Sequence, residues 1–289
     1  MNRLQLLVAL MSVASTSTAC DRTRIALPDS VATAQPNLSV ERSEAAPRST
    51  SAPSPVANRE QRIHVPGGSV IVGGKPIAVS EFSMDRTEVT VREYIKCVQA
   101  GRCTPSATAA NCNASQPEKK ADHPINCVTV EQARVYCESQ RARLPSVAEW
   151  QLAAAGPEGR VYPWGDAAPS NIRFDEAPQD GAFKPGPARH HLCWVGDGTA
   201  QGETFARGTC PVGTHTAGNT PSGIADLAGN VWEWTSDSAK LPHGPLNHVL
   251  KGGSYEYDRM GLPEYHVTDA ETHEPKHSAP NAGFRCVAG

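Results

Sequence analysis

The sequence has no run of five or six like charges and no apolar stretch long enough to form a permanent membrane-spanning helix. Its formal net charge is only −3 over 289 residues. These absences argue against the basic surface of a nucleic-acid-binding protein and against a polybasic patch that holds a chain on a membrane. We therefore expect no nucleic acid among its partners.

Cysteine motifs that bind zinc are also absent. The nine cysteines contain no Cys-x-x-Cys, and no group of cysteines and histidines has zinc-finger spacing. The sequence therefore predicts no structural zinc site. There is also no cysteine at all between Cys210 and Cys286.

The first twenty residues have the pattern of an export signal. Arg3 supplies a positive charge, residues 4–14 are apolar, and small residues lead to Cys20. The end of this segment resembles a bacterial lipoprotein cleavage site. We expect a lipid on Cys20 and an exported, membrane-anchored protein that faces the periplasm or the cell surface. The alternative is ordinary cleavage, which leaves Cys20 free or paired.

A polar segment follows the signal. Residues 21–61 are rich in Ser, Thr, Ala and Pro and have almost no aromatic side chains. Such a segment cannot bury enough apolar surface to offset the entropy lost on ordering, so it is predicted to be a disordered tether. Residues 62–289 are of the right length for one folded domain.

Export places the cysteines in an oxidising compartment, where disulfides form. Without Cys20 an even number remains, so every thiol has a partner available. Eight cysteines can pair in roughly a hundred ways, and counting alone does not fix the connectivity. The eight are Cys97, Cys103, Cys112, Cys127, Cys137, Cys193, Cys210 and Cys286.

Three helices are predicted from their capping boxes, in which a hydroxyl accepts a backbone N–H and an acid or amide reaches back. The boxes begin at Thr90, Thr129 and Ser146. A turn and an apolar run over residues 65–72 predict a strand. After Gly156 the sequence is rich in Gly, Pro, Asn and Asp, which predicts loops and short strands. Such a region has little regular hydrogen bonding, so we expect disulfides or a bound metal to stabilise it.

Six short motifs occur in order between residue 62 and the C-terminus. Together they resemble the formylglycine-generating (sulfatase-modifying factor) family. The resemblance implies a single α+β domain of the C-type-lectin-like kind, poor in regular structure. The motifs are Glu88-Val89-Thr90, Arg143-Leu144-Pro145-Ser146-x-x-Glu149-Trp150, Tyr162-Pro163-Trp164-Gly165, Gly229-Asn230-Val231-Trp232-Glu233-Trp234, Lys251-Gly252-Gly253-Ser254 and Gly283-Phe284-Arg285-Cys286.

The resemblance fails at the residues that carry the family's chemistry. Catalytic members bind copper(I) with two cysteines shortly after the Gly-Gly-Ser strand and oxidise a substrate cysteine to formylglycine. That chemistry needs soft thiolate ligands. The matching positions here are Tyr257 and Leu262. We expect no catalytic residues for this reaction and no copper.

The family's disulfide between the middle of the domain and its end corresponds to Cys137 with Cys286. The other three pairings follow only from proximity in the sequence, so alternatives remain open. They are Cys193 with Cys210, Cys97 with Cys103, and Cys112 with Cys127.

The resemblance also implies calcium, which prefers hard oxygen ligands on a turning backbone. Family members bind calcium at a first site around the Gly-Asn-x-Trp-Glu-Trp motif. A second site would use Asn171 and Ile172, with Asp197 as our candidate for the acid. The alternative is that Asp226 caps a turn and Glu233 is a solvated strand residue. The residues of the first site would be Asp226, Leu227, Gly229, Val231 and Glu233.

The late histidines are interpreted as surface residues, because no Cys, Asp or Glu lies near them at ligand spacing. They are His266, His273 and His277.

The sequence therefore favours a monomeric, non-catalytic binding or scaffolding module at the cell envelope, where its partner would be a protein or peptide. The alternative is an enzyme of the formylglycine-generating type, or another modifying enzyme, that acts on an exported protein. A structural lipoprotein with no ligand beyond calcium is a third reading. Fold alone does not decide among them.

Overall fold

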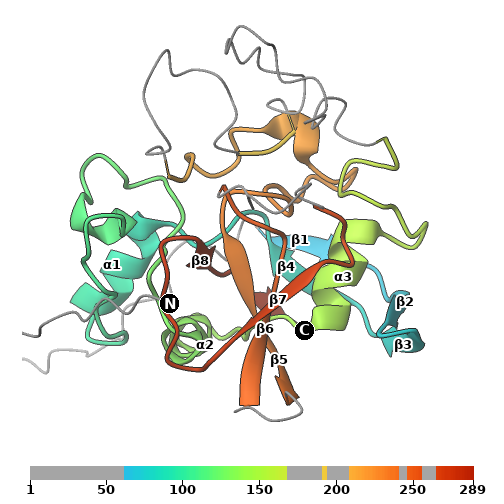
Figure 1. Ribbon diagram of the computed structural model, residues 1–289, viewed down its shortest axis with the longest axis horizontal. Coiled ribbons are helices and arrows are strands. Elements are labelled where there is room, and N and C mark those ends of the chain that lie inside the picture. The colour runs from blue at the N-terminus through green and yellow to red at the C-terminus, as the bar shows by residue number, and fades with distance from the viewer. Residues whose placement is uncertain (1–61, 168–190, 194–207, 241–245, 256–264) are drawn as a thin grey trace, which may run out of the picture. The chain divides into compact units, whose positions relative to one another are not determined.

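A computed structural model describes residues 62–167, 191–193, 208–240, 246–255 and 265–289 (Figure 1). Among these residues no helix is both long and apolar enough to cross a bilayer. The elements are β1 (Arg62–Val65), β2 (Gly68–Val72), β3 (Lys75–Val79), β4 (Phe82–Asp85), α1 (Val91–Gln99), α2 (Val130–Ser139), α3 (Val147–Ala155), β5 (Trp232–Lys240), β6 (Leu246–Lys251), β7 (Ala270–His273), β8 (Ala282–Gly283) and β9 (Val287–Ala288), with short 3₁₀ turns at Asn113–Ser115 and Thr216–Gly218.

The three predicted helices are confirmed, and each begins with a complete capping box. At the start of α1, the Thr90 side chain accepts the Glu93 N–H, and the Glu93 carboxylate accepts the Thr90 N–H at 2.9 Å. Thr129 and Ser146 do the same for α2 and α3. Because each box satisfies backbone donors that the first turn leaves unpaired, these short helices begin at fixed residues.

The strands form three small sheets instead of one large one. The strand orders are β1-β4-β9, β2-β3 and β7-β6-β5-β8. In the largest sheet β5 pairs antiparallel with β6 and parallel with β8, so the chain near the C-terminus returns beside the Trp232–Trp234 motif. In the view of Figure 1, α3 lies on the opposite side of the β5–β6 pair from α1 and α2.

Two apolar clusters make up most of the core. One lies around α1, α2 and β5 and contains Phe284 and Cys286, while the other lies around α3, β2 and β4 and contains Val287. The C-terminal segment therefore passes from one cluster to the other. Between Phe284 and Cys286 stands Arg285, which is fully buried.

Four disulfides use all eight cysteines of residues 62–289. The bridge Cys137–Cys286 joins α2 to the C-terminal segment across 149 residues of sequence. The structure thus joins the same four pairs that the sequence suggested. The other bridges are Cys97–Cys103, Cys112–Cys127 and Cys193–Cys210.

Candidate functional site

A fully buried ion pair lies where β5 meets the C-terminal segment. The guanidinium of Arg285 binds both carboxylate oxygens of Glu233, with Nε to Oε2 at 2.8 Å and Nη2 to Oε1 at 2.7 Å. Both side chains have no exposed surface. Two parallel charge-assisted hydrogen bonds fix the relative orientation of the two planar groups.

The remaining donors of Arg285 are also satisfied. Its Nη1 donates to the carbonyl oxygens of Asp85 and Arg86, and its Nη2 also donates to the carbonyl oxygen of Ala225. All five N–H groups of the guanidinium therefore have acceptors, as a buried arginine requires. The side chain links β4, the loop before β5 and β5 itself.

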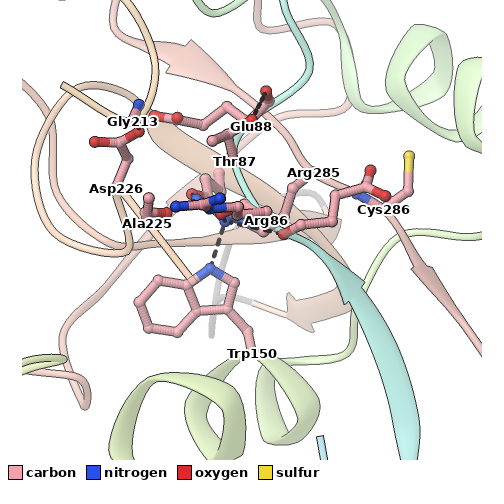
Figure 2. Close-up of polar contacts among 11 residues, drawn as sticks. Arg86, Thr87, Glu88, Trp150, Gly213, Ala225, Asp226, Arg285 and Cys286 are labelled. Atoms are coloured by element: carbon pink, nitrogen blue, oxygen red, sulfur yellow. Dashed lines mark hydrogen bonds and ion pairs between the residues drawn. The ribbon is translucent and has the colours of Figure 1, made fainter. Parts of the chain in front are cut away.

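Trp150 of α3 completes the shell around Glu233. Its indole N–H donates to Oε2 of Glu233 at 2.8 Å. Figure 2 shows the indole nitrogen of Trp150 pointing toward the Arg285 guanidinium, and Oε2 of Glu233 accepts a hydrogen bond from each of them. Glu233 is therefore a buried, hydrogen-bonded residue, and the alternative of a solvated strand side chain is wrong.

A second acid nearby has no such partners. Glu88 is fully buried, and no N–H or hydroxyl group of the described residues donates to its carboxylate oxygens; its polar neighbour is the carboxyl group of Asp226, with which it forms a hydrogen bond when one of the two acids is protonated. In Figure 2, Glu88 and Asp226 lie at the side of the cluster away from Trp150. A buried carboxylate without a partner is costly unless it holds a proton or a cation.

The electrostatics of Glu88 follow from this placement. Burial raises the pKa of Glu88 well above its ordinary value, and the neighbouring Asp226 and Glu233 carboxyls raise it further, whereas Arg285 lowers it. Burial also raises the pKa of Asp226. Three carboxylates against one guanidinium leave two negative charges uncompensated when all are ionised, and a divalent cation would neutralise them.

Asp226 is held at the head of a turn. Its Oδ2 accepts the Gly213 N–H, and its backbone has a φ of 56°, which is uncommon for a residue other than glycine. The prediction that this residue caps a turn and the prediction that it binds an ion are compatible, because Oδ2 is engaged by one N–H and the carboxylate has a second oxygen.

The turn that follows, Gly229-Asn230, also has left-handed backbone at both residues, with φ of 79° and 59°. Glycine is required at the first position, because a Cβ there would lie 2.7 Å from the carbonyl oxygen of Cys193. The turn then leads into β5 and Glu233. A turning backbone flanked by acids supplies the carbonyl and carboxylate oxygens that calcium prefers.

The structure therefore places the residues of the first predicted calcium site in one continuous turn and strand, and it adds a candidate that the sequence did not assign, Glu88. That residue stands in the first of the six motifs, but only its burial beside Asp226 marks it as a ligand candidate. Several other predicted residues lie outside the described part of the chain, namely Cys20, Asn171, Ile172, Asp197, Tyr257 and Leu262.

The cysteines do not offer a copper(I) site in the described structure. The copper(I) site of the catalytic family members uses two free thiolates, whereas the sulfur atoms of all eight cysteines in residues 62–289 are bonded to one another in pairs. The group Cys193, Cys210 and His215 brings two sulfurs and a ring nitrogen within 4.8 Å of one another, but both sulfurs are in a disulfide.

One expectation about the histidines is wrong. The sequence suggested no acidic partner for them, but His273 Nε2 lies 3.0 Å from Oε1 of Glu271. The two residues are two positions apart in β7, so their side chains lie on the same face of the strand. The ring of His273 also stacks on His277 at 3.7 Å between centroids.

Comparison with known proteins assigns the fold. The model of the sulfatase-modifying factor enzyme 1-like domain matches residues 47–289. The chain belongs to this family. As a member of the sulfatase-modifying factor family, it has the α+β, disulfide-stapled fold that the six motifs predicted.

Curated relatives include enzymes and a protein named as inactive. The formylglycine-generating enzyme of Bos taurus is 30% identical over 184 residues, which cover 58% of this chain and 45% of that protein. The inactive C-alpha-formylglycine-generating enzyme 2 of Bos taurus is 32% identical over 176 residues, covering 59% and 52%. The matched region thus spans about half the length of these relatives.

Solved structures agree on the fold alone. CarF superimposes with a TM-score of 0.56 at 20% identity and covers 79% of this chain and 97% of its own. PvdO from Pseudomonas aeruginosa gives a TM-score of 0.51 at 21% identity, covering 78% and 93%.

Proposed function

We propose that this family member is a binding or scaffolding module and not an oxidase of the formylglycine-generating type. The proposal rests on two facts about the cysteines: those of the folded domain are paired in disulfides, and none stands at the positions of the copper-binding pair. The eight cysteines of residues 62–289 are cross-linked, and Tyr257 and Leu262 occupy the positions of the copper-binding pair. A phenol and an alkyl group cannot replace thiolates as copper(I) ligands.

The relatives are consistent with this proposal. At about the same identity, the chain resembles proteins named formylglycine-generating enzyme and proteins named inactive C-alpha-formylglycine-generating enzyme 2. Overall similarity therefore does not decide activity, and the presence or absence of the reactive side chains must.

We further propose that the acid cluster binds calcium as a structural ion. Glu88 and Asp226 would supply carboxylate oxygens, and the backbone of Leu227, Gly229 and Val231 would supply carbonyl oxygens. Oε1 of Glu233 accepts one hydrogen bond, from Arg285, and so retains acceptor capacity toward the ion. The bound ion would neutralise the charge that otherwise forces a proton onto Glu88.

We place the protein outside the cytoplasm, anchored through a lipid on Cys20, with an envelope protein or peptide as partner. Four disulfides support an oxidising compartment. Metabolic labelling with a fatty-acid analogue tests the anchor: the Cys20→Ser chain should lose the label that the wild-type chain carries.

An aldehyde assay tests the absence of oxidase activity. The purified chain is incubated with copper(I), oxygen, an electron donor and a Cys-x-Pro-x-Arg sulfatase peptide, and the peptide is then analysed for aldehyde. The formylglycine-generating enzyme of Streptomyces coelicolor, which is 32% identical over 182 residues, serves as the positive control. We expect aldehyde only in the control, and aldehyde formed by this chain would overturn the proposal.

A second candidate function is a modifying enzyme that uses other residues. The similarity to the hercynine oxygenase of Mycolicibacterium thermoresistibile, 32% identical over 123 residues that cover 40% of this chain and 21% of that protein, favours it. Copper or iron bound at one equivalent per chain after purification would support this candidate over the first.

A further inference from the structure

We infer that the Cys193–Cys210 disulfide is a positioning element of the proposed calcium site. In this inference, the bridge holds the Gly229-Asn230 turn in the conformation that presents the carbonyl groups of Gly229 and Val231 to the ion. The inference rests on the calcium function proposed above and goes beyond it, because it assigns a role in ion affinity to a cross-link.

Cys193 contacts the turn through its backbone. Its carbonyl oxygen accepts the Asn230 N–H at 3.1 Å, and its backbone forms an isolated parallel bridge with Gly229. The close approach of the Cys193 carbonyl oxygen is what excludes a Cβ at Gly229. The position of Cys193 therefore sets the position of both residues of the turn.

Cys210 contacts the same turn from a second segment. Its N–H donates to Oδ1 of Asn230 at 3.0 Å. Three residues later, the N–H of Gly213 donates to the Asp226 carboxylate. The segment that begins at Cys210 thus holds both the side chain of Asn230 and that of a proposed ligand.

The turn needs such support. Asn230 has a left-handed backbone. This conformation costs free energy in a residue that has a Cβ, and it persists only where the surrounding contacts hold it. Residues 191–193 belong to no helix or strand. The disulfide therefore supplies a covalent link between two irregular segments that grip the turn, and without it these hydrogen bonds would have to fix both segments by themselves.

Calcium affinity of matched variants tests the inference. We propose isothermal titration of calcium chloride into the full chain, the Cys193→Ser/Cys210→Ser variant and a control, Cys97→Ser/Cys103→Ser. The control removes the bridge between α1 and the loop that follows it. The Cys97 sulfur of this bridge lies 3.3 Å from Oγ of Ser139 in α2, not beside the Gly229-Asn230 turn. Both double variants should melt at lower temperature in chelator, because each loses a cross-link.

Only the Cys193→Ser/Cys210→Ser variant should lose affinity for calcium, by roughly 10- to 100-fold, the usual loss when a partner that orients metal ligands is removed. Equal affinity of that variant and the wild-type chain would overturn the inference. An equal loss in both double variants would also overturn it, because it would show a general effect of destabilisation.

A third variant covers the case in which the double serine variant does not fold. Asn230→Gly keeps the disulfide and tolerates the left-handed backbone, but it removes the side-chain acceptor for Cys210. It should also weaken calcium binding, and unchanged affinity in this variant would overturn the inference. If the wild-type chain itself binds no calcium, the proposed calcium function is wrong. If the wild-type chain binds calcium and the variants bind it equally well, only the role assigned to the disulfide is wrong.

Discussion

Replacing Glu88 with glutamine should change stability in opposite directions with and without calcium. In chelator the wild-type protein buries an acid whose pKa is raised by burial and by Asp226. Near pH 7 the fold must keep a proton on this acid or bury its charge, and either costs stability relative to the unfolded chain. The amide of Glu88→Gln has a similar shape and no charge, so the variant should be at least as stable as the wild type in chelator.

The calcium-bound state should show the reverse. At a free calcium concentration about 100 times the dissociation constant, binding adds about 2.7 kcal/mol to the free energy of unfolding. For a domain of this size that corresponds to roughly 5–10 °C in melting temperature. Because glutamine removes a charged ligand, most of this increment should disappear in Glu88→Gln.

Differential scanning calorimetry in calcium and in chelator measures both effects. Glu118→Gln is the matched control, because Glu118 is an exposed acid whose replacement should leave both melting temperatures within about a degree. If Glu88→Gln kept the full calcium increment, the assignment of Glu88 as a ligand would be wrong. If it melted well below the wild type in chelator, burial of Glu88 beside Asp226 would not be a cost to the fold.

Three further predictions concern cross-links, pH and the turn. Removing the Cys137–Cys286 bridge, which spans 149 residues, should lower the free energy of unfolding by about 4–5 kcal/mol in urea titrations, and a loss below 1 kcal/mol would contradict this. Burial lowers the pKa of His123 to about 4, so the fold is destabilised as the pH falls from about 6.5 toward 4, where the unfolded chain binds a proton that the folded chain does not. His123→Gln should therefore flatten the pH dependence of the free energy of unfolding across that range. An unchanged slope would count against this role of His123. Gly229→Ala places a Cβ 2.7 Å from a carbonyl oxygen at a φ of 79°, and we expect a melting temperature lower by several degrees in chelator as well as in calcium.

Local patterns in the sequence were sufficient for the helices. Each capping box lies within four consecutive residues, and all three begin a helix where predicted. The order of motifs was likewise sufficient for the family and the fold. These features are readable because they depend on residues that are close in sequence, or on a pattern that many proteins share.

The environment of the site was not predictable in the same way. Glu233 binds Trp150, 83 residues away, and Arg285, 52 residues away, and nothing local to Glu233 indicates either contact. The burial of Glu88 beside Asp226 depends equally on tertiary packing. Asp226 and the turn could be predicted as calcium ligands because the family motif marks them, whereas Glu88 becomes a candidate ligand only through its position in the structure.

Copper(I) binding distinguishes a non-catalytic module from an oxidase of the formylglycine-generating type, because the oxidase must hold copper(I) with free thiolates. The full chain with Cys20→Ser, which removes the one cysteine outside the four bridges, is titrated with copper(I) in competition with a chromophoric chelator. We expect the chelator to keep the copper, whereas the Streptomyces coelicolor enzyme should take it up. One copper(I) held by sulfur in this chain, seen by X-ray absorption, would contradict the proposal that the chain is not such an oxidase.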